Sequence, residues 1–216
     1  MSERRGSERR CPVCDAVLGP WWRCPNYWCH RDDRGFDTVW AVGEHRGELR
    51  HAIAALKYRG DRRFGPVLGR VLAEFLVERT PVFDDVDVIV GTPGTLGWSR
   101  PCDHTGEILA AARRLVGDLW RIDTDVLAKT EATRPLMGTA AGLRRLRAAG
   151  ELRASLAVTD PGAVVGRRIL AVDDVFTDGS TLREVAGVLR RAGALSVSGL
   201  VLARQPLGSP GGRRSS

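Results

Sequence analysis

The sequence predicts an α/β protein in which a parallel sheet is flanked by helices, with a small cysteine-rich segment at the N-terminus. Short apolar runs, such as residues 169–172, alternate with stretches of helical spacing. Such runs are typical of parallel strands, because these strands are covered on both faces. Four cysteines lie near the N-terminus in two close pairs. At 216 residues, the chain is long enough for one α/β core and a small appendage.

The four cysteines predict a zinc site. Cys11, Cys14, Cys24 and Cys29 form the pattern C-x2-C-x9-C-x4-C, and His30 follows directly. Two close pairs separated by a short loop suit a tetrahedral zinc ion. The second spacing is longer than the commonest one, so His30 is an alternative to Cys29 as fourth ligand. Four protein ligands leave no open position, so the expected zinc is structural. The competing interpretation is a site of reduced cysteines without metal.

Aromatic side chains crowd the same segment, namely Trp21, Trp22, Tyr27 and Trp28. Exposed rings of this kind form stacking platforms for the bases of single-stranded nucleic acid. A segment of about 30 residues is, however, too small to form a core of its own. We therefore favour packing of these rings against the main domain.

The expected organisation has four segments. These are a disordered tail over 1–9, a cysteine zinc knuckle over 10–40, a main domain over 41–204 and a second disordered tail over 205–216. Both tails are rich in Gly, Ser and Arg, a composition that cannot bury enough apolar surface to fold.

The first part of the main domain shows alternating helix and strand patterns. In chain order they predict helices over 49–57 and 67–76, a strand over 86–90, a Gly/Pro turn over 91–95, a helix over 108–119 and a short strand over 124–127. The turn contains Thr92 and Pro93 and permits unusual backbone geometry beside a ligand. Because ligands of parallel sheets bind at the carboxyl ends of strands, this turn falls where a site is expected.

The most informative segment is RRILAVDDVFTDGST, which begins at residue 167. A buried strand over 169–172 is followed by an acidic pair, Asp173 and Asp174, and helical spacing resumes at Leu182. The segment between them is therefore a loop that leads into a helix N-terminus. The two carboxylates would repel a phosphate bound at that loop, so they suit hydroxyl groups or a metal ion.

The loop itself is an anion site by its composition. It consists of Thr177, Asp178, Gly179, Ser180 and Thr181. The first turn of a helix has unpaired N–H groups and a partial positive charge, which favour a phosphate. The glycine lets the backbone curl closely, and the hydroxyl groups add donors. An ordinary capped turn between strand and helix is the simpler alternative. A P-loop ATPase is excluded, because neither lysine of the chain follows a glycine.

This order of strand, acidic pair and loop resembles the 5-phosphoribosyl 1-pyrophosphate (PRPP) signature of type I phosphoribosyltransferases. The resemblance implies that Asp173 and Asp174 hold the ribose 2′ and 3′ hydroxyls and that the loop cradles the 5′-phosphate. Asp178 departs from the signature, because the family usually carries a small or hydroxyl residue there. Its charge is expected to weaken phosphate binding unless the side chain points away or serves as a base.

The layout over about residues 11–204 resembles the ComF/GntX type of phosphoribosyltransferase. The resemblance rests on the cysteine knuckle, a helix that ends in L-K-Y-x-G at 56–60, and the PRPP signature. The family's R-G-F-[N/D]-[Q/H] element is matched by R-P-C-D-H at 100–104. Its P-V-P pyrophosphate turn is reduced to T-P-G at 92–94, and the Gln and Asn expected between 133 and 154 are absent. The chain is thus identified as a divergent member.

The resemblance also implies a type I phosphoribosyltransferase fold, with Mg²⁺ bound together with PRPP and with catalysis at Asp173 and Asp174. Thr92, Pro93 and Arg100 would lie at the pyrophosphate. The basic stretch over 129–153 forms either a mobile hood that meets the pyrophosphate or a solvated helix face. The predicted activity is transfer of the phosphoribosyl group with loss of pyrophosphate.

Two other functions stay open at this point. The family's link to DNA uptake implies a module that binds single-stranded DNA on a transferase scaffold. A PRPP sensor without turnover is the other alternative. The net charge of +7 fits a nucleic-acid or polyphosphate partner. However, 31 of the 33 basic residues are Arg, a bias that a GC-rich genome gives without function.

The remaining expectations concern location. The chain contains no apolar stretch that approaches the ~18 residues of a membrane span, and its first ten residues are polar. We therefore expect a cytoplasmic protein, in which the cysteines bind metal or stay reduced.

Overall fold

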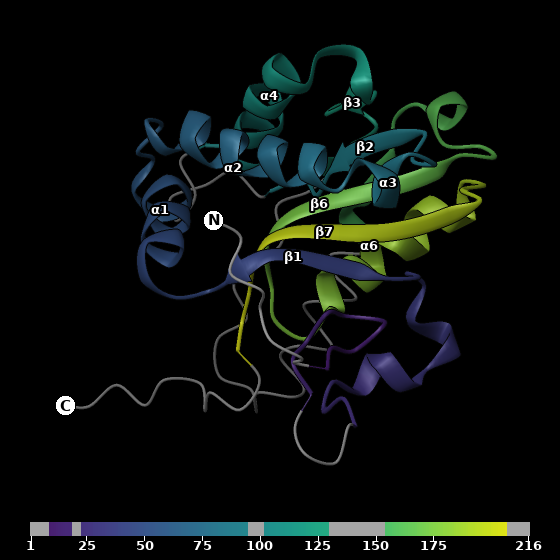
Figure 1. The fold of residues 1–216 in the computed structure, drawn as a ribbon. Coiled ribbons are helices and arrows are strands. Elements are labelled where there is room, and N and C mark those ends of the chain that lie inside the picture. Colours follow the sequence, from purple (N-terminus) through teal and green to yellow (C-terminus); the bar gives the residue numbers. More distant parts are fainter. Residues whose placement is uncertain (1–8, 19–22, 95–101, 130–153, 207–216) are drawn as a thin grey trace.

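A five-stranded parallel sheet forms the centre of the molecule (Figure 1). The computed structural model describes residues 9–18, 23–94, 102–129 and 154–206. The strands lie in the order β1 (Val39–Glu44), β7 (Ser196–Arg204), β6 (Arg168–Phe176), β2 (Val88–Gly91) and β3 (Ile122–Asp123). A separate antiparallel pair consists of β4 (Leu127–Lys129) and β5 (Leu156–Val158).

Helices cover both faces of the sheet. One face carries α1 (Gly47–Arg59), α2 (Phe64–Glu78), α3 (Thr80–Phe83) and α4 (His104–Val116). The opposite face carries α6 (Ser180–Arg191) and the N-terminal segment, which contains the short 3-10 helices η1 (Tyr27–His30) and η2 (Asp32–Arg34). Two further 3-10 turns are η3 (Gly117–Leu119) and η4 (Pro161–Ala163). Figure 1 shows α2 and α4 above the sheet, α1 at its left, and the N-terminal segment below it.

The sheet separates two apolar cores. Along β6, Ile169 and Ala171 face α6 and the N-terminal segment, whereas Leu170 and Val172 face the helices α1 to α4. Successive side chains of a strand point to opposite faces, so an uninterrupted apolar run fills both cores at once. The predicted fold class, a parallel sheet flanked by helices with an N-terminal cysteine segment, is confirmed.

Three details differ from the sequence expectations. The strand predicted over 169–172 extends to Phe176, so the acidic pair lies inside β6 and not after it. The strand predicted over 124–127 is wrong for residues 124–126, which form a bend between β3 and β4, and only Leu127 lies in a strand, as the first residue of β4. Strands β1 and β7 were not anticipated, although β7 is the longest neighbour of β6.

Several predictions lie outside the described residues. They concern most of both tails, Trp21 and Trp22, Arg100 and the stretch over 130–153. Within the described ranges, no helix combines the length and apolar character that a membrane span needs.

Candidate functional site

The predicted phosphate loop connects β6 to the N-terminus of α6. Gly179 is the residue before the helix and adopts the left-handed conformation, with φ of 93°. A Cβ at this position would lie 2.8 Å from Cζ of Phe176 and 3.5 Å from Cζ of Phe36. Glycine is therefore required twice, once for the backbone angle and once for the close approach to the aromatic rings.

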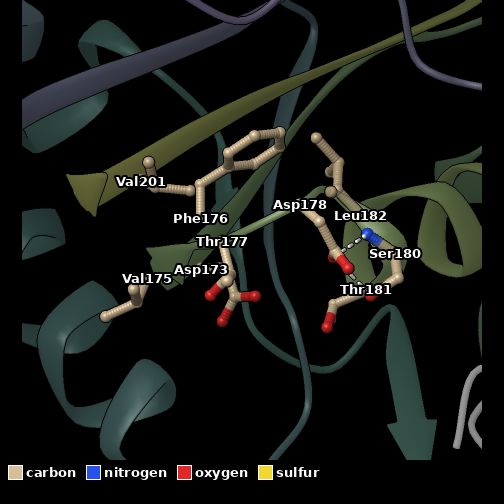
Figure 2. A pocket seen from close by; sticks show the side chains of 10 residues that line it. Asp173, Val175, Phe176, Thr177, Asp178, Ser180, Thr181, Leu182 and Val201 are labelled. Atoms are coloured by element: carbon tan, nitrogen blue, oxygen red, sulfur yellow. Dashed lines mark hydrogen bonds between the residues drawn. The ribbon is translucent and has the colours of Figure 1, made fainter. Parts of the chain in front are cut away.

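A small pocket lies at this loop, and Figure 2 shows its lining. It is lined by Asp173, Val175, Phe176, Thr177, Asp178, Gly179, Ser180, Thr181, Leu182 and Val201. Its volume is about 80 Å³, well below the ~300–1,000 Å³ of most sites for larger ligands. The structure thus brings Asp173 and the whole predicted loop together around a space that suits a phosphate-sized group.

Asp178 turns back onto the loop. Its Oδ1 accepts hydrogen bonds from the backbone N–H of Ser180 at 3.0 Å and from the Ser180 hydroxyl at 2.8 Å (Figure 2). The carboxylate thereby occupies donors at the start of α6 that a bound phosphate would use. Because the helix N-terminus attracts negative charge, Asp178 acts in this structure as an internal substitute for an anion.

The two carboxylates of the acidic pair have different surroundings. Asp173 is half-buried and lines the pocket, whereas Asp174 is only 3% exposed and does not line it. Burial and the neighbouring Asp174 carboxylate raise the pKa of Asp173. Burial would also raise the pKa of Asp174, but the hydrogen bond with His104 and the charge of Lys57 outweigh it and hold that pKa below its usual range.

Asp174 is held by two residues from the other face of the sheet. Lys57, near the end of α1, donates from Nζ to Oδ2 of Asp174 at 2.5 Å. His104, the first residue of α4, places Nε2 3.4 Å from the same oxygen. The side chains of Asp174 and His104 are 3% and 4% exposed, and that of Lys57 is 13% exposed. The result is a buried cluster of charged groups beneath the carboxyl edge of the sheet.

The predicted pyrophosphate turn follows β2. The backbone N–H of Thr92 donates to the carbonyl of Val172 on β6 at 2.8 Å, which fixes the start of the turn beside the acidic pair. Thr92 is buried and Pro93 is half-buried. Both predicted residues therefore lie at the same sheet edge as Asp173, since parallel strands end on one side. The role of Arg100 stays a prediction, because that residue is outside the described ranges.

The four predicted zinc ligands gather in one cluster. The thiol groups of Cys11, Cys14, Cys24 and Cys29 all lie within 4.8 Å of one another. The sulfurs of Cys14 and Cys24 are 3.6 Å apart, close to the ~3.8 Å between two ligands of a tetrahedral zinc ion. Hydrogen bonding with Cys29 and the charge of Arg204 help to lower the pKa of the Cys14 thiol to about 5. Four soft donors with this geometry suit a structural metal such as zinc.

His30 has another partner. Its Nε2 lies 2.6 Å from the carbonyl oxygen of Cys24, and the ring takes no part in the thiol cluster. The structure therefore favours Cys29 over His30 as the fourth ligand. The backbone of the cluster is also tied to the main sheet, because the N–H of Val39 on β1 donates to the carbonyl of Val13.

Arg204 connects the cysteine cluster to the phosphate loop. This residue ends β7, is buried, and donates to the carbonyl oxygen of Cys14 and, at 3.3 Å, to its sulfur. Its guanidinium lies 4.9 Å from the ring centroid of Phe176, which supports Gly179. No sequence pattern identified Arg204, because one arginine among 31 gives no signal.

The aromatic residues of the knuckle divide between packing and exposure. Trp28 packs against the core of the α6 face. The Arg183 guanidinium lies over its ring, with Cζ 4.5 Å from the centroid of the Trp28 ring. Tyr27 is 62% exposed and lies beside Arg31. The packing interpretation thus holds for Trp28 and not for Tyr27.

Lys57 and His104 are the residues near the site whose role the sequence did not reveal. Both belong to motifs that the sequence showed, but nothing in the linear order places them at Asp174. One compositional signal was present, since Lys57 is one of only two lysines in a chain that otherwise uses arginine. Lysine carries a more compact cation than arginine, and such a group fits the short contact with Asp174.

Comparison with curated proteins gives matches of two kinds. The chain is 29% identical to the DNA utilization protein YhgH of Escherichia coli K12 over 204 residues, which cover 93% of this chain and 86% of that protein. It is 25% identical to YhgH of Salmonella typhi over 199 residues, with 90% and 83% covered. It is also 48% identical over 52 residues to an orotate phosphoribosyltransferase of Xanthomonas campestris, or 23% of each chain. No protein-family model matches.

Phosphoribosyltransferases are among the solved structures that match. One is the glutamine PRPP amidotransferase of Bacillus subtilis, with a TM-score of 0.37 and 24% identity over 63% of this chain. This chain spans only 25% of that protein. Another is a hypoxanthine phosphoribosyltransferase of Staphylococcus aureus, with a TM-score of 0.38 and 13% identity, covering 69% of this chain and 67% of the other.

Proposed function

We propose that this protein is a Mg²⁺-dependent phosphoribosyltransferase that binds PRPP and releases pyrophosphate. The observation that carries the proposal is the shared pocket of Asp173 and the loop over 177–181, at the N-terminus of α6. The loop would receive the 5′-phosphate, and Asp173 would receive the sugar hydroxyls. The local identity with orotate phosphoribosyltransferases supports this assignment.

The chemistry follows from these positions. The bond between C1 and the pyrophosphate oxygen breaks, its electron pair leaves with pyrophosphate, and the acceptor forms a new bond to C1. Bound Mg²⁺ would neutralise charge on the leaving pyrophosphate, and the oxygens of Asp173 and Thr177 are donors that suit it. The carboxylate of Asp173 would also stabilise positive charge that grows at C1. Positioning by the loop supplies most of the remaining rate.

We further propose that the cysteine cluster holds a structural zinc ion. Arg204 contacts both Cys14 of the cluster and the ring of Phe176, and thereby links the cluster to the loop over 177–181. A closed set of four cysteine ligands has no open position for substrate, so the role of the metal is to fix the knuckle on the sheet. Thiol groups of this kind persist in a reducing compartment, and we place the protein in the cytoplasm.

Calorimetry with two ligands tests the proposal. PRPP with Mg²⁺ is expected to bind the wild-type protein, and ribose 5-phosphate is expected to bind more weakly to the same loop. Asp173→Asn should weaken both by at least about tenfold, because a hydrogen bond to a charged group is worth ~1.5–3 kcal/mol. The proposed function would be overturned if PRPP did not bind the wild-type protein, or if Asp173→Asn bound it with equal affinity. Release of pyrophosphate then distinguishes an enzyme from a sensor that binds without turnover.

A second candidate function is binding of single-stranded DNA. The YhgH proteins that match along most of the chain are named DNA utilization proteins, and Tyr27 offers an exposed ring beside the Arg31 guanidinium. If this function holds, an oligonucleotide should bind with an affinity that falls steeply with salt, and Tyr27→Ala should weaken it. Binding that is insensitive to both would exclude a role for the knuckle.

A further inference from the structure

Two sequence motifs that the proposed function leaves without a role meet at Asp174. Lys57 belongs to the L-K-Y-x-G motif at the end of α1, and His104 closes the R-P-C-D-H motif at the start of α4. Both side chains contact the same oxygen, Oδ2 of Asp174. The other oxygen, Oδ1, accepts the backbone N–H of Val175 at 2.9 Å. Asp174 is therefore committed to protein partners on the α1 and α4 face.

Buried polar atoms without partners surround this cluster. Among the described residues, Nδ1 of His104 and the hydroxyl groups of Thr92 and Thr105 are buried and make no hydrogen bond. These three residues are between 2% and 6% exposed. An unpaired buried polar atom costs ~1–3 kcal/mol, so three of them in one region indicate that their partner is a ligand.

The same atoms lie at one place in the fold. A Cβ on Gly94 would lie 3.7 Å from Nδ1 of His104, and a Cβ on Gly91 would lie 3.4 Å from Cγ2 of Thr105. The turn after β2 therefore rests directly on the first residues of α4. That helix has 13 residues, and its N-terminus carries a partial positive charge.

The orientation of the His104 ring follows from its neighbours. Nε2 is directed at the Asp174 carboxylate, and Nδ1 lies near the turn after β2, 3.7 Å from a Cβ built on Gly94. Lys57 and His104 are thus both oriented by one carboxylate below this turn.

We propose that the acidic pair is divided, with Asp173 facing the sugar and Asp174 acting as a positioning residue that orients Lys57 and His104 to bind the pyrophosphate group of PRPP. The inference rests on the proposed function, because it assigns residues to the second half of the same ligand. Pyrophosphate carries several negative charges and gains more as the bond to C1 breaks, so the oriented Lys57 cation and the oriented His104 ring favour its departure. The hydroxyl groups of Thr92 and Thr105 would supply additional donors.

The test uses the two halves of PRPP as separate probes. Calorimetry with ribose 5-phosphate reports on the loop and Asp173, and calorimetry with Mg²⁺ and pyrophosphate reports on Lys57 and His104. Three variants test the second site, namely Asp174→Asn, Lys57→Met and His104→Gln. Each should lower the affinity for pyrophosphate by about tenfold or more and change the affinity for ribose 5-phosphate by no more than about twofold. Asp173→Asn should weaken the binding of ribose 5-phosphate by about tenfold or more, which none of these three variants should do. A loss of ribose 5-phosphate binding in Asp174→Asn equal to that in Asp173→Asn would overturn the division.

A second measurement avoids the risk that a buried variant does not fold. In the wild-type protein, the imidazole ¹⁵N signals of His104, assigned with His104→Gln, should shift on addition of pyrophosphate and not of ribose 5-phosphate. Lys57→Arg should retain part of the pyrophosphate affinity that Lys57→Met loses, because the charge is kept. If PRPP binds and the His104 signals do not move, this inference fails and the proposed function stands. If neither probe binds the wild-type protein, both fail.

Discussion

The two faces of the sheet differ sharply at the carboxyl end of β6. On the α6 face, Asp173 lines an open pocket beside a loop of hydroxyl and N–H donors. On the α4 face, Asp174 is buried with Lys57 and His104. The pKa of Asp173 is raised and that of Asp174 is lowered, although the two are neighbours in the sequence. Because adjacent side chains of a strand point to opposite faces, one acidic pair supplies two different chemical environments.

The largest expected effect is on the cysteine cluster that supports the α6 face. Cys14→Ser should lose bound zinc and unfold at ordinary temperature, since a structural zinc contributes ~10–16 kcal/mol in small zinc domains. Cys102→Ser is the matched control, because this buried cysteine lies outside the cluster and contacts the carbonyl of Leu56. Metal analysis and thermal unfolding measure both. Wild-type protein without zinc, or a Cys14→Ser variant as stable as Cys102→Ser, would contradict the assignment.

The next effect concerns the buried ions of the α4 face. Lys57→Met leaves the Asp174 carboxylate with less compensation and should lower the free energy of unfolding by about 3–5 kcal/mol. Arg70→Met, which breaks an exposed pair with Glu74, should cost only ~0.3–0.5 kcal/mol. Urea unfolding at pH 7 compares them, and similar losses would mean that burial of the pair has no energetic consequence.

The pH dependence of the same pair has a definite sign. The pKa of Asp174 is lowered in the folded state, so its contribution to stability is present above the unfolded pKa of about 3.9. It is lost as the pH falls below that value. The difference between wild type and Lys57→Met should therefore be similar at pH 7 and pH 5.

A glycine pair separates backbone strain from packing on the α6 face. Gly179 and Gly166 both have positive φ, but a Cβ would meet Phe176 only at Gly179 and nothing within 4 Å at Gly166. Each change to Ala should cost ~1–2 kcal/mol for the left-handed backbone. Only Gly179→Ala should also lower the affinity for ribose 5-phosphate, by about tenfold or more, because the added Cβ displaces the loop. Equal binding by the two variants would show that the loop does not hold the phosphate.

Asp173→Asn should make the protein without ligand more stable at high pH. Burial and Asp174 raise the pKa of Asp173 to about 7, against about 3.9 in the unfolded chain, so stability is lost as the pH rises between these two values. At pH 8 the variant removes a cost of at most about 4 kcal/mol, which should raise Tm. Below about pH 3.9 the side chain is protonated in both states and the difference should disappear. A lower Tm for the variant at both pH values would contradict this account.

The smallest expected effect is on phosphate affinity through Asp178. Asp178→Thr frees the N–H and hydroxyl of Ser180 and removes a negative charge, so ribose 5-phosphate should bind a few-fold more tightly, about 0.5–1 kcal/mol. Ser180→Ala removes a donor and should act in the opposite direction. Calorimetry at one ionic strength compares them, and weaker binding by Asp178→Thr would indicate that this carboxylate assists the ligand.

The sequence predicted much of the site and less of the sheet. The loop over 177–181 was found because glycine, hydroxyl residues and a change of period occur together over a short stretch. The cysteine cluster was found for the same reason, since its spacing is local. Strands β1 and β7 were missed because their pairings, β1 with β7 and β7 with β6, are long-range. Strand β6 was predicted too short because Asp173 and Asp174 interrupt its apolar run.

By itself, the sequence determined the parallel α/β class, the group of four cysteines and the loop at the start of α6, because each depends on residues that are close together along the chain. Only the tertiary structure decided that Asp173 and Asp174 separate, that Lys57 and His104 meet at Asp174, and that Arg204 joins the cysteines to Phe176. These contacts connect segments far apart in the chain, and burial rather than residue type sets their energies.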